Sequence, residues 1–435
     1  MDNPFFHRGA IRRAEEFHGR ESEINQVLGL LRNGQSVSIV GPRRIGKSSL
    51  LLHLSRPVAR APMSMAPPQA LFVPIDCQEL GGSPPEEVYE AFLTNLLDAA
   101  EAAGMDFGEI NRPGTYRALD RALHKVHAAG SQVVLLLDEF ELLAANEHLT
   151  PYFFARLRGL TTKYGLAYLT ASQRPLFAIT ADEQILSSPF FNIFVTMPLG
   201  LFSEVEARSL LEQRLTDCAI RFNPALVDHL LELVGPHPFF LHLAAYYAFQ
   251  LLAEGHKLER DADWSQLDAA VEVEAASHLQ YLWANLLPEE RYSLAAGHGP
   301  VETMRQLEQQ CLLQPGEDGY LYTSELLRRF VRQQEVSGLI QAGPFVIDQQ
   351  RYEVRAGGLE LSLTNSQFDL LVRLGQQAGQ VVPADELEIA VWGDALVDDP
   401  DRLKTLIKRL RRAIEPYSSW IVSERGIGYA LRSPE

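Results

Sequence analysis

The stretch SVSIVGPRRIGKSSLLLHL (residues 36–54) places a glycine-rich loop between a β-branched apolar run and the start of a helix. Residues 41–48 match the pattern G-x-x-x-x-G-K-[ST], whose glycines let backbone N–H groups turn toward a phosphate. Lys47 is then expected to contact the β- and γ-phosphates, and Ser48 to bind Mg²⁺. The predicted nucleotide-contacting residues are Gly41, Pro42, Arg43, Arg44, Ile45, Gly46, Lys47, Ser48 and Ser49. The alternative is a glycine turn in front of an ordinary helix.

A second run, VVLLLDEF (residues 133–140), has the continuous apolar character of a strand buried on both faces of a parallel sheet. It ends in two carboxylates, Asp138 and Glu139. Ligands of open α/β sheets bind at the carboxyl ends of the strands. We therefore expect Asp138 to hold Mg²⁺ and Glu139 to orient and deprotonate the attacking water. Two alternatives stay open: the acids are merely solvated, or Glu139 supports only a slow switch rather than fast turnover.

Composition limits the classes of protein to which the chain can belong. With 435 residues, 46% of them hydrophobic, it has room for about three domains. The formal net charge is −17, of which residues 344–435 carry −3, so a nucleic-acid surface over the whole chain is not expected. Its start lacks an apolar signal core, and the most apolar helix, residues 239–253, is too short to span a bilayer. Three widely separated cysteines without ligand spacing favour a reducing compartment. A cytoplasmic protein without membrane contact is expected.

The periodicity of the chain predicts several domains in succession. Strands are expected at 37–40, 71–75, 133–137, 166–170 and 193–197, alternating with helices as in a parallel sheet with crossover helices. The expected fold class is a multidomain α/β P-loop NTPase with helical lid and winged helix, to which a family resemblance of residues 344–432 adds a C-terminal α+β winged helix-turn-helix. The expected limits are a nucleotide-binding domain (1–200), a helical lid (201–268), a winged-helix relay domain (269–335), a linker (336–343) and a C-terminal winged helix (344–435).

Two segments of this plan carry further expectations. The proline-rich run RPVARAPMSMAPPQA (residues 56–70) is expected to be a loop, because proline continues neither a helix nor a strand. The expected relay domain contains two short extended runs around a Pro-Gly-Glu-Asp-Gly turn at residues 315–319. A packing module that relays the nucleotide state and a second DNA-contacting module are both compatible with this pattern.

The N-terminal two thirds resemble a known class of signalling ATPases. Phe17-His18-Gly19-Arg20-Glu21, GPRRIGKSS (41–49), LLLDEF (135–140) and GPHPFFL (235–241) are together similar to STAND-class, AAA+-related P-loop ATPases over about residues 3–335. The resemblance implies that Phe17, His18 and Gly19 line the adenine pocket and that Pro238 of the lid contacts the base or ribose. Pro236 departs from the family pattern, in which a second glycine is usual, and the alternative for Pro238 is an ordinary proline at a helix start.

The same resemblance assigns a role to the end of the fourth expected strand. LTASQRP (residues 169–175) stands at the position that senses the γ-phosphate in that class. By this resemblance Arg174 contacts the γ-phosphate through a charge-assisted hydrogen bond. The alternative is an ordinary surface ion pair.

The C-terminal residues contain a cationic amphipathic helix, DRLKTLIKRLRRAIE (residues 401–415). Its apolar residues gather in one arc, and its basic residues fill the opposite half of the helical wheel. Those basic residues are Arg402, Lys404, Lys408, Arg409, Arg411 and Arg412. Such a face suits the major groove of double-stranded DNA, where Lys and Arg meet phosphates and guanine edges, although solvated cationic faces are also common.

The order of the neighbouring segments resembles a second family. LTNSQFDLLVRL (363–374), ADELEIAVWG (384–393), the basic helix and ERGIGY (424–429) are together similar to the OmpR/PhoB type of winged helix. The resemblance makes Arg402–Ile414 the recognition helix, makes Arg425, Gly426 and Tyr429 part of the wing, and places an RNA polymerase contact in GDALVDDP (393–400). Leu406 and Glu424 depart from the family pattern, so the base preference does not carry over.

Together these patterns predict an ATP-dependent transcription regulator. A STAND-type switch, using ATP/ADP and Mg²⁺ with slow hydrolysis, would control the C-terminal DNA reader. Expected partners are double-stranded DNA, RNA polymerase, further copies of the chain in a homo-oligomer and an unknown signal ligand or protein. The alternatives are an origin-recognition-like DNA-remodelling or replication-helper ATPase, and an immune-type sensor that oligomerises with ATP.

Overall fold

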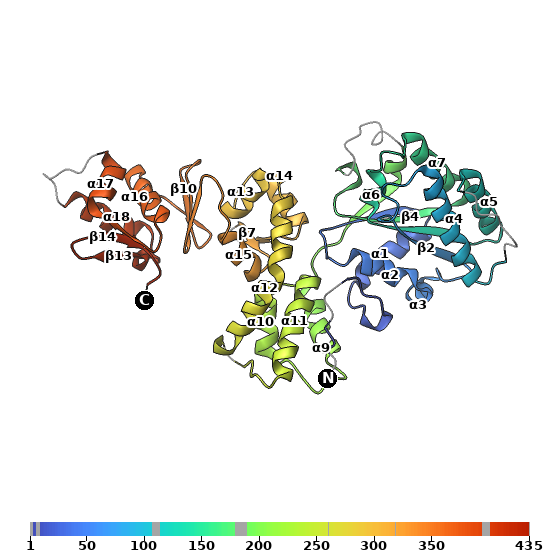
Figure 1. Cartoon of the computed structure of the whole chain (residues 1–435), viewed down its shortest axis with the longest axis horizontal. Coiled ribbons are helices and arrows are strands. Elements are labelled where there is room, and N and C mark those ends of the chain that lie inside the picture. Colours follow the sequence, from blue (N-terminus) through green and yellow to red (C-terminus); the bar gives the residue numbers. More distant parts are fainter. Residues whose placement is uncertain are drawn as a thin grey trace. The chain divides into compact units, whose positions relative to one another are not determined.

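The computed structural model describes residues 3–5, 9–106, 114–178, 189–259, 261–317, 319–393 and 401–434. The chain forms two compact units (Figure 1). The first comprises residues 1–273 and 309–311, and the second comprises residues 274–308 and 312–435.

A parallel sheet forms the centre of the first unit. Its strands are β1 (Ser36–Val40), β2 (Ala70–Asp76), β3 (Gln132–Asp138), β4 (Ala167–Ser172) and β5 (Phe194–Pro198), in the order β2-β3-β4-β1-β5. All neighbouring pairs are parallel, so the predicted α/β sheet is confirmed. Because parallel strands end at one edge, the tips of β1, β3 and β4 lie next to one another.

Helices cover both faces of this sheet. Side chains alternate between the faces of a strand, and the two apolar sets are buried by different helices. On one face α1 (Glu21–Arg32) and α2 (Lys47–Ser55) pack on residues such as Ile39 and Leu136. On the other, α4 (Pro85–Ala102), α5 (Tyr116–Ala128) and α7 (Pro151–Tyr164) pack on residues such as Leu135 and Tyr168. The short helix α6 (Phe140–Ala144) follows β3 directly.

The proline-rich run after α2 is more ordered than the predicted loop. It contains a helical turn, α3 (Pro57–Arg60), followed by η2 (Ala61–Met63). Pro57 occupies the first turn, where its missing N–H costs nothing. The guanidinium of Arg60 is buried, donates to the Met65 carbonyl at 2.9 Å and lies 4.0 Å from the centre of the Phe72 ring. The loop prediction is therefore wrong here, because a buried cation supplies the partners that the prolines do not.

The predicted helical lid is present after β5. It consists of α9 (Glu204–Arg214), α10 (Pro224–Val234) and α11 (Pro238–Ala253). Ser203 and Glu206 form a reciprocal capping box at the start of α9, and the Asn223 side chain caps α10. The next helix, α12 (Asp261–Asn285), runs without interruption through residues 268 and 269, where a domain limit is expected.

The second unit begins with a small helical module. After α12 come α13 (Pro288–Ala296), α14 (Val301–Gln309), an antiparallel hairpin and α15 (Glu325–Arg332). The hairpin pairs β6 (Leu313–Gly316) with β7 (Gly319–Tyr322). The relay domain expected at residues 269–335 is a winged helix, and the helices and hairpin found here are the elements of such a fold.

In the C-terminal part, the described residues form two antiparallel sheets and three α-helices. The first sheet has the order β11-β10-β9-β8 and consists of β8 (Leu339–Ala342), β9 (Phe345–Asp348), β10 (Glu353–Ala356) and β11 (Leu359–Leu361). The second has the order β12-β14-β13 and consists of β12 (Val381–Pro383), β13 (Ile421–Glu424) and β14 (Gly428–Leu431). The helices are α16 (Asn365–Gln376), α17 (Ala384–Trp392) and α18 (Arg402–Ala413).

Two local expectations in this part have clear outcomes. The predicted capping box of Thr364 and Gln367 is present at the start of α16. Residues 339–342, expected in the linker, instead form β8, because this run pairs with β9 along its whole length. Buried side chains of α16 and α18, among them Leu371 and Leu410, share one core with the first sheet.

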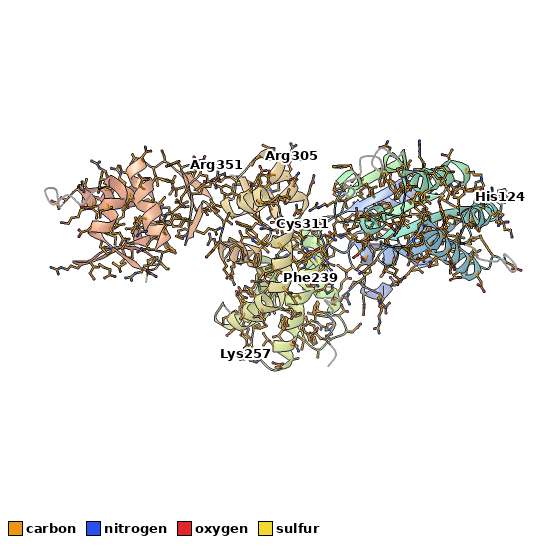
Figure 2. The ribbon with its side chains drawn as sticks, turned by 45° about the horizontal axis from the view of Figure 1, so that its top comes forward. His124, Phe239, Lys257, Arg305, Cys311 and Arg351 are labelled. Carbon is orange, nitrogen blue, oxygen red and sulfur yellow. The ribbon has the colours of Figure 1, made fainter. Side chains whose placement is uncertain are left out.

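Side chains fill the space between these elements (Figure 2). Cys77 and Cys311 are buried, and all three cysteines are free thiols. Within the described part of the chain, no helix is both long enough and apolar enough to cross a membrane.

Candidate functional site

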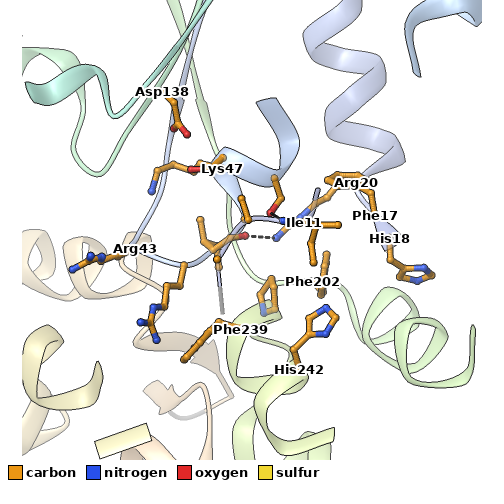
Figure 3. Close-up of a pocket in the computed structure, with 18 of the residues that line it drawn as sticks. Ile11, Phe17, His18, Arg20, Arg43, Lys47, Asp138, Phe202, Phe239 and His242 are labelled. Carbon is orange, nitrogen blue, oxygen red and sulfur yellow. Dashed lines mark hydrogen bonds between the residues drawn. The ribbon is translucent and has the colours of Figure 1, made fainter. Parts of the chain in front are cut away.

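A cavity of about 350 Å³ lies at the carboxyl edge of the parallel sheet, within the first unit (Figure 3). Its walls come from four places: the N-terminal segment, the loop before α2, the tips of β3 and β4, and the lid. Segments far apart in the sequence thus converge on one hollow.

The loop before α2 has the geometry that a phosphate-binding backbone needs. Gly46 has φ 104°, which side chains rarely allow, and precedes Lys47, the first residue of α2. A Cβ on Gly41 would lie 2.5 Å from the carbonyl oxygen of Leu199, the residue after β5, so the loop approaches this backbone too closely for a side chain at position 41. The loop therefore presents the N-terminus of α2 to the cavity.

Lys47 points into the centre of this loop. Its Nζ donates to the carbonyl oxygens of Gly41 at 2.7 Å and of Pro42 at 2.9 Å. Burial lowers the pKa of the ammonium group, while the nearby carboxylates Glu141 and Asp138 raise it. A buried cation whose hydrogen bonds among the described residues go to neutral carbonyls is well placed to bind an anion.

The two predicted metal ligands are brought together. Asp138, the last residue of β3, is hydrogen-bonded to the Ser48 side chain and accepts the Glu139 N–H at 3.0 Å. Burial raises the pKa of Asp138, and the Ser48 hydrogen bond opposes that rise. A hydroxyl and a carboxylate are oxygen donors of the kind that Mg²⁺ prefers, so this pair fits the ion.

Glu139 stands at the same edge in an unusual backbone conformation. Its φ of 48° lies in the left-handed region, and Glu139 is the single residue between the end of β3 and the start of α6. Burial raises the pKa of its carboxyl group, and Glu141 is the nearby charge that raises it most. Both Glu139 and Glu141 line the cavity.

The far end of the cavity is largely aromatic. Phe17 and His18 of the N-terminal segment line it together with Phe202, Phe239 and His242 of the lid (Figure 3). The Phe17 ring stacks on His53 of α2, with ring centres 4.1 Å apart, and burial lowers the pKa of His18. Flat apolar walls of this kind suit a planar base.

The remaining residues predicted from the resemblance occupy different positions. Pro238 lines the cavity as the first residue of α11. Gly19 lies just outside it, in a neighbouring hollow, where a Cβ would come within 3.3 Å of the Phe202 ring. Arg43 and Arg44 line the cavity, and the Arg44 guanidinium lies 4.2 Å from the centre of the Phe239 ring.

Arg20 connects the walls of the cavity to one another. Its side chain is buried, donates to the Gly200 carbonyl at 2.6 Å and lies 4.5 Å from the centre of the Phe202 ring. Its backbone N–H donates to Glu206 of the lid at 2.7 Å. A second tie joins the N-terminal segment to α2, because the Ile11 N–H donates to Ser49 Oγ at 3.0 Å.

The tip of β4 differs from the expectation in detail. Arg174 is exposed and does not line the cavity, whereas its neighbour Gln173 does. The Gln173 N–H donates to Glu141 Oε1 at 3.2 Å. Sequence reasoning placed Gln173 at this tip, within LTASQRP, but missed Glu141. The available signal for Glu141 was its place two residues after Glu139, in the first turn of α6.

Helix α18 presents a cationic face with four exposed members. Leu403, Leu406, Ile407 and Leu410 are buried, as predicted. The exposed basic residues are Lys404, Lys408, Arg409 and Arg412. Lys404 pairs with Asp401 at 3.0 Å, in an exposed ion pair.

The other two predicted members of that face are engaged within the domain. Arg402 pairs with Glu388 at 3.2 Å and lies 4.4 Å from the centre of the Trp392 ring. The Arg411 guanidinium donates to the Ile421 carbonyl at 2.6 Å and to Ser423 Oγ at 2.9 Å. Arg411, one of the six basic residues of the predicted cationic face, is therefore not free in this structure, because β13 lies within its reach.

The wing is the turn between β13 and β14. Arg425 and Gly426 are exposed there, and Gly426 has φ 78°. Tyr429 is half-buried on β14. Glu424, which departs from the expected apolar residue, pairs with Arg432 at 2.6 Å across the two strands. The segment predicted to contact RNA polymerase, residues 393–400, lies outside the described residues after Gly393.

Two family profiles match the chain. The family described as Novel STAND NTPase 2 matches residues 26–297, and the family described as transcriptional regulatory protein, C terminal, matches residues 358–431. An α/β P-loop NTPase fold and an OmpR/PhoB-type winged helix thus follow each other in one chain.

Individual proteins resemble the two parts separately. The sensory transduction protein RegX3 of Mycobacterium leprae is 35% identical over 99 residues, which are 22% of this chain and 50% of that protein. The response regulator ArlR of Staphylococcus aureus is 29% identical over 108 residues, which are 24% of this chain and 49% of that protein. The chain thus spans about half the length of these curated relatives. A Walker-type ATPase of Pyrococcus abyssi shares the fold over 76% of this chain and 99% of its own, with TM-score 0.53 and 15% identity.

Proposed function

We propose that this chain, which belongs to the Novel STAND NTPase 2 family, is a nucleotide-controlled transcription regulator. ATP or ADP binds in the cavity at the edge of the parallel sheet, and the bound nucleotide sets the affinity of residues 344–435 for specific DNA sites. One observation carries the proposal: a phosphate-binding loop with its acidic partners and an OmpR/PhoB-type reader occur in a single chain.

Different residues of the cavity bind different parts of the nucleotide and its metal ion. Lys47 exchanges its carbonyl partners for the β- and γ-phosphates, and the N-terminus of α2 supplies N–H donors. Ser48 and Asp138 hold Mg²⁺, which neutralises phosphate charge when it is bound. Glu139 orients the attacking water, and its raised pKa suits a group that accepts a proton. Phe17 and His18 hold the base against the lid.

The DNA-binding part of the proposal rests on the exposed cations. Lys404, Lys408, Arg409 and Arg412 lie on one face of α18, and Arg425 lies at the tip of the wing. A helix with such a face enters the major groove, while a wing grips the neighbouring minor groove or its phosphates. Arg402 and Arg411 hold α18 against α17 and the wing, and so orient the reading face. We further propose that RNA polymerase contacts residues 393–400 and that ATP promotes a homo-oligomer.

Selection of genomic DNA fragments with the full-length protein tests this function. We expect a small set of related sequences to be enriched, with an enrichment that differs between ATP, ADP and no nucleotide. Such a difference requires that ATP and ADP bind the DNA-binding and non-binding states with different affinities. Enrichment without sequence preference, combined with DNA-stimulated ATP hydrolysis, would instead favour a DNA-remodelling or replication-helper ATPase. Oligomerisation on ATP without DNA selection would favour an immune-type sensor.

We expect the exposed cations of α18 to carry the salt dependence of DNA binding. Lys408→Ala and Arg412→Ala each remove one phosphate contact, which reduces the slope of log affinity against log salt by about 1. A residue that reads a base would instead lose about 1–3 kcal/mol on the preferred site and little on random duplex. Fluorescence anisotropy across a salt series measures both effects.

The matched control for this experiment is Lys257→Ala. Lys257 is an exposed lysine of the first unit (Figure 2), so its removal changes the net charge equally without touching α18. We expect its slope to equal that of the wild type. Identical slopes and affinities for all four proteins would show that the cationic face of α18 is merely solvated.

A further inference from the structure

A third carboxylate, Glu141, stands behind the pair at the tip of β3. It lies in the first turn of α6 and lines the same cavity as Lys47 and Asp138. Neither the phosphate-binding loop nor the metal pair uses it. Its position therefore requires an explanation of its own.

The two oxygens of Glu141 have different surroundings. Oε1 accepts the Gln173 N–H at 3.2 Å, which links α6 to the tip of β4. Oε2 is buried and has no hydrogen-bond partner among the residues that the structure describes. Burying a carboxylate oxygen without a hydrogen-bond donor costs free energy. The charge of such a group also interacts strongly with nearby charges, because little solvent screens it.

The charge of Glu141 acts on the phosphate end of the cavity. Among the three carboxylates that raise the pKa of Lys47, Glu141 is the strongest, ahead of Asp138 and Glu139. Glu141 and Lys47 line the same cavity, so this carboxylate is one of the negative charges near the ammonium group that is expected to meet the γ-phosphate. When Lys47 binds a γ-phosphate, the negative charge of that phosphate comes close to the Glu141 carboxylate, and the two groups repel each other.

We propose that Glu141 is the residue that makes the cavity distinguish ATP from ADP, with the Gln173 N–H as the partner it releases when a γ-phosphate is present. This inference rests on the proposed nucleotide site. ADP leaves the Glu141–Gln173 hydrogen bond intact, because no third phosphate reaches Lys47. ATP repels the Glu141 carboxylate, and its rotation frees the tip of β4. The repulsion also lowers the affinity for ATP relative to ADP.

The decisive variant is Glu141→Gln, which keeps the shape and an acceptor for Gln173 but removes the charge. We expect calorimetry on the full-length protein to show ATP affinity about tenfold higher than in the wild type and ADP affinity changed by less than about twofold. Glu147→Gln removes an exposed acid just beyond α6, and as the matched control it leaves both affinities unchanged. Thermal melting checks that each variant is folded.

Amide hydrogen exchange of a peptide containing Gln173 supplies a readout that does not depend on affinity. In the wild type, ATP should accelerate exchange at this amide and ADP should not, whereas in Glu141→Gln neither nucleotide should. An unchanged ratio of ATP to ADP affinity in Glu141→Gln, or equal exchange with both nucleotides in the wild type, overturns the inference and leaves the nucleotide site standing. A wild-type protein that binds neither nucleotide overturns the proposed function as well.

Discussion

Lys47→Ala is expected to weaken nucleotide binding about a hundredfold while leaving the fold intact. The Lys47 ammonium contacts only loop carbonyls in the described structure, at 2.7 and 2.9 Å from Gly41 and Pro42, so its loss removes no tertiary contact. Loss of a charge-assisted bond to phosphate in a buried site corresponds to about 3 kcal/mol, or about a hundredfold in affinity. Titration calorimetry with ATP and with ADP measures the effect.

The control for this variant is the loss of another lysine of the first unit, one that lies outside the cavity. Lys163→Ala removes an exposed ion pair, in which Lys163 Nζ lies 2.7 Å from Asp120 Oδ1, and leaves the cavity untouched. We expect its ATP affinity to equal that of the wild type. Since burial lowers the pKa of Lys47, its removal is not expected to lower the melting temperature. ATP affinity that survives in Lys47→Ala would refute the assignment of the loop.

Glu139→Gln is expected to slow ATP hydrolysis about a hundredfold while ATP stays bound, because a general base typically contributes 10² to 10⁴ in rate. The amide keeps the size of the side chain but cannot accept the proton of the water. Asp138→Asn is expected to act differently and weaken the magnesium complex, since it removes the charge that faces Ser48. Phosphate release and nucleotide affinity at several magnesium concentrations separate the two effects.

Asp76→Asn provides the matched control for both variants. Asp76 ends β2 and is the register partner of Asp138, but it is exposed and does not line the cavity. Its hydrolysis rate should stay within about twofold of the wild type, because a solvated charge is strongly screened. Wild-type hydrolysis in Glu139→Gln and Asp138→Asn alike would mean that the tip of β3 is not the reaction centre.

Local patterns were sufficient to predict the framework of the molecule. Five short apolar runs predicted the strands of the parallel sheet, because a strand buried on both faces needs apolar residues in succession. The 3.6-residue period likewise predicted the buried side of α18, including Leu403 and Leu410. Family resemblance, rather than periodicity, supplied the aromatic wall at Phe17 and His18. Phe17 and His18 lie far from the lid in sequence, so only the tertiary fold brings them and the lid to the same cavity.

The hydrogen-bond and ion-pair partners of polar side chains depend on which groups the fold brings close together. Hydrophobic periodicity in the sequence does not predict these partners. The six basic residues of α18 look alike on a helical wheel, yet Arg402 meets Glu388 of α17 and Arg411 meets the carbonyl of Ile421. Only the packing of α17 and β13 separates them from the four exposed cations.

The same reason applies at the nucleotide cavity and in the proline-rich run. A hydrogen bond is decided by a few ångströms between groups, so the link from Glu141 to Gln173 exists only because β3 and β4 end side by side. The buried guanidinium of Arg60 orders a run whose prolines predict a loop, because the fold supplies carbonyl partners and the Phe72 ring around it. Hydrophobic periodicity, encoded residue by residue, determined the elements and the core, whereas the partners of the polar side chains were decided by tertiary contacts.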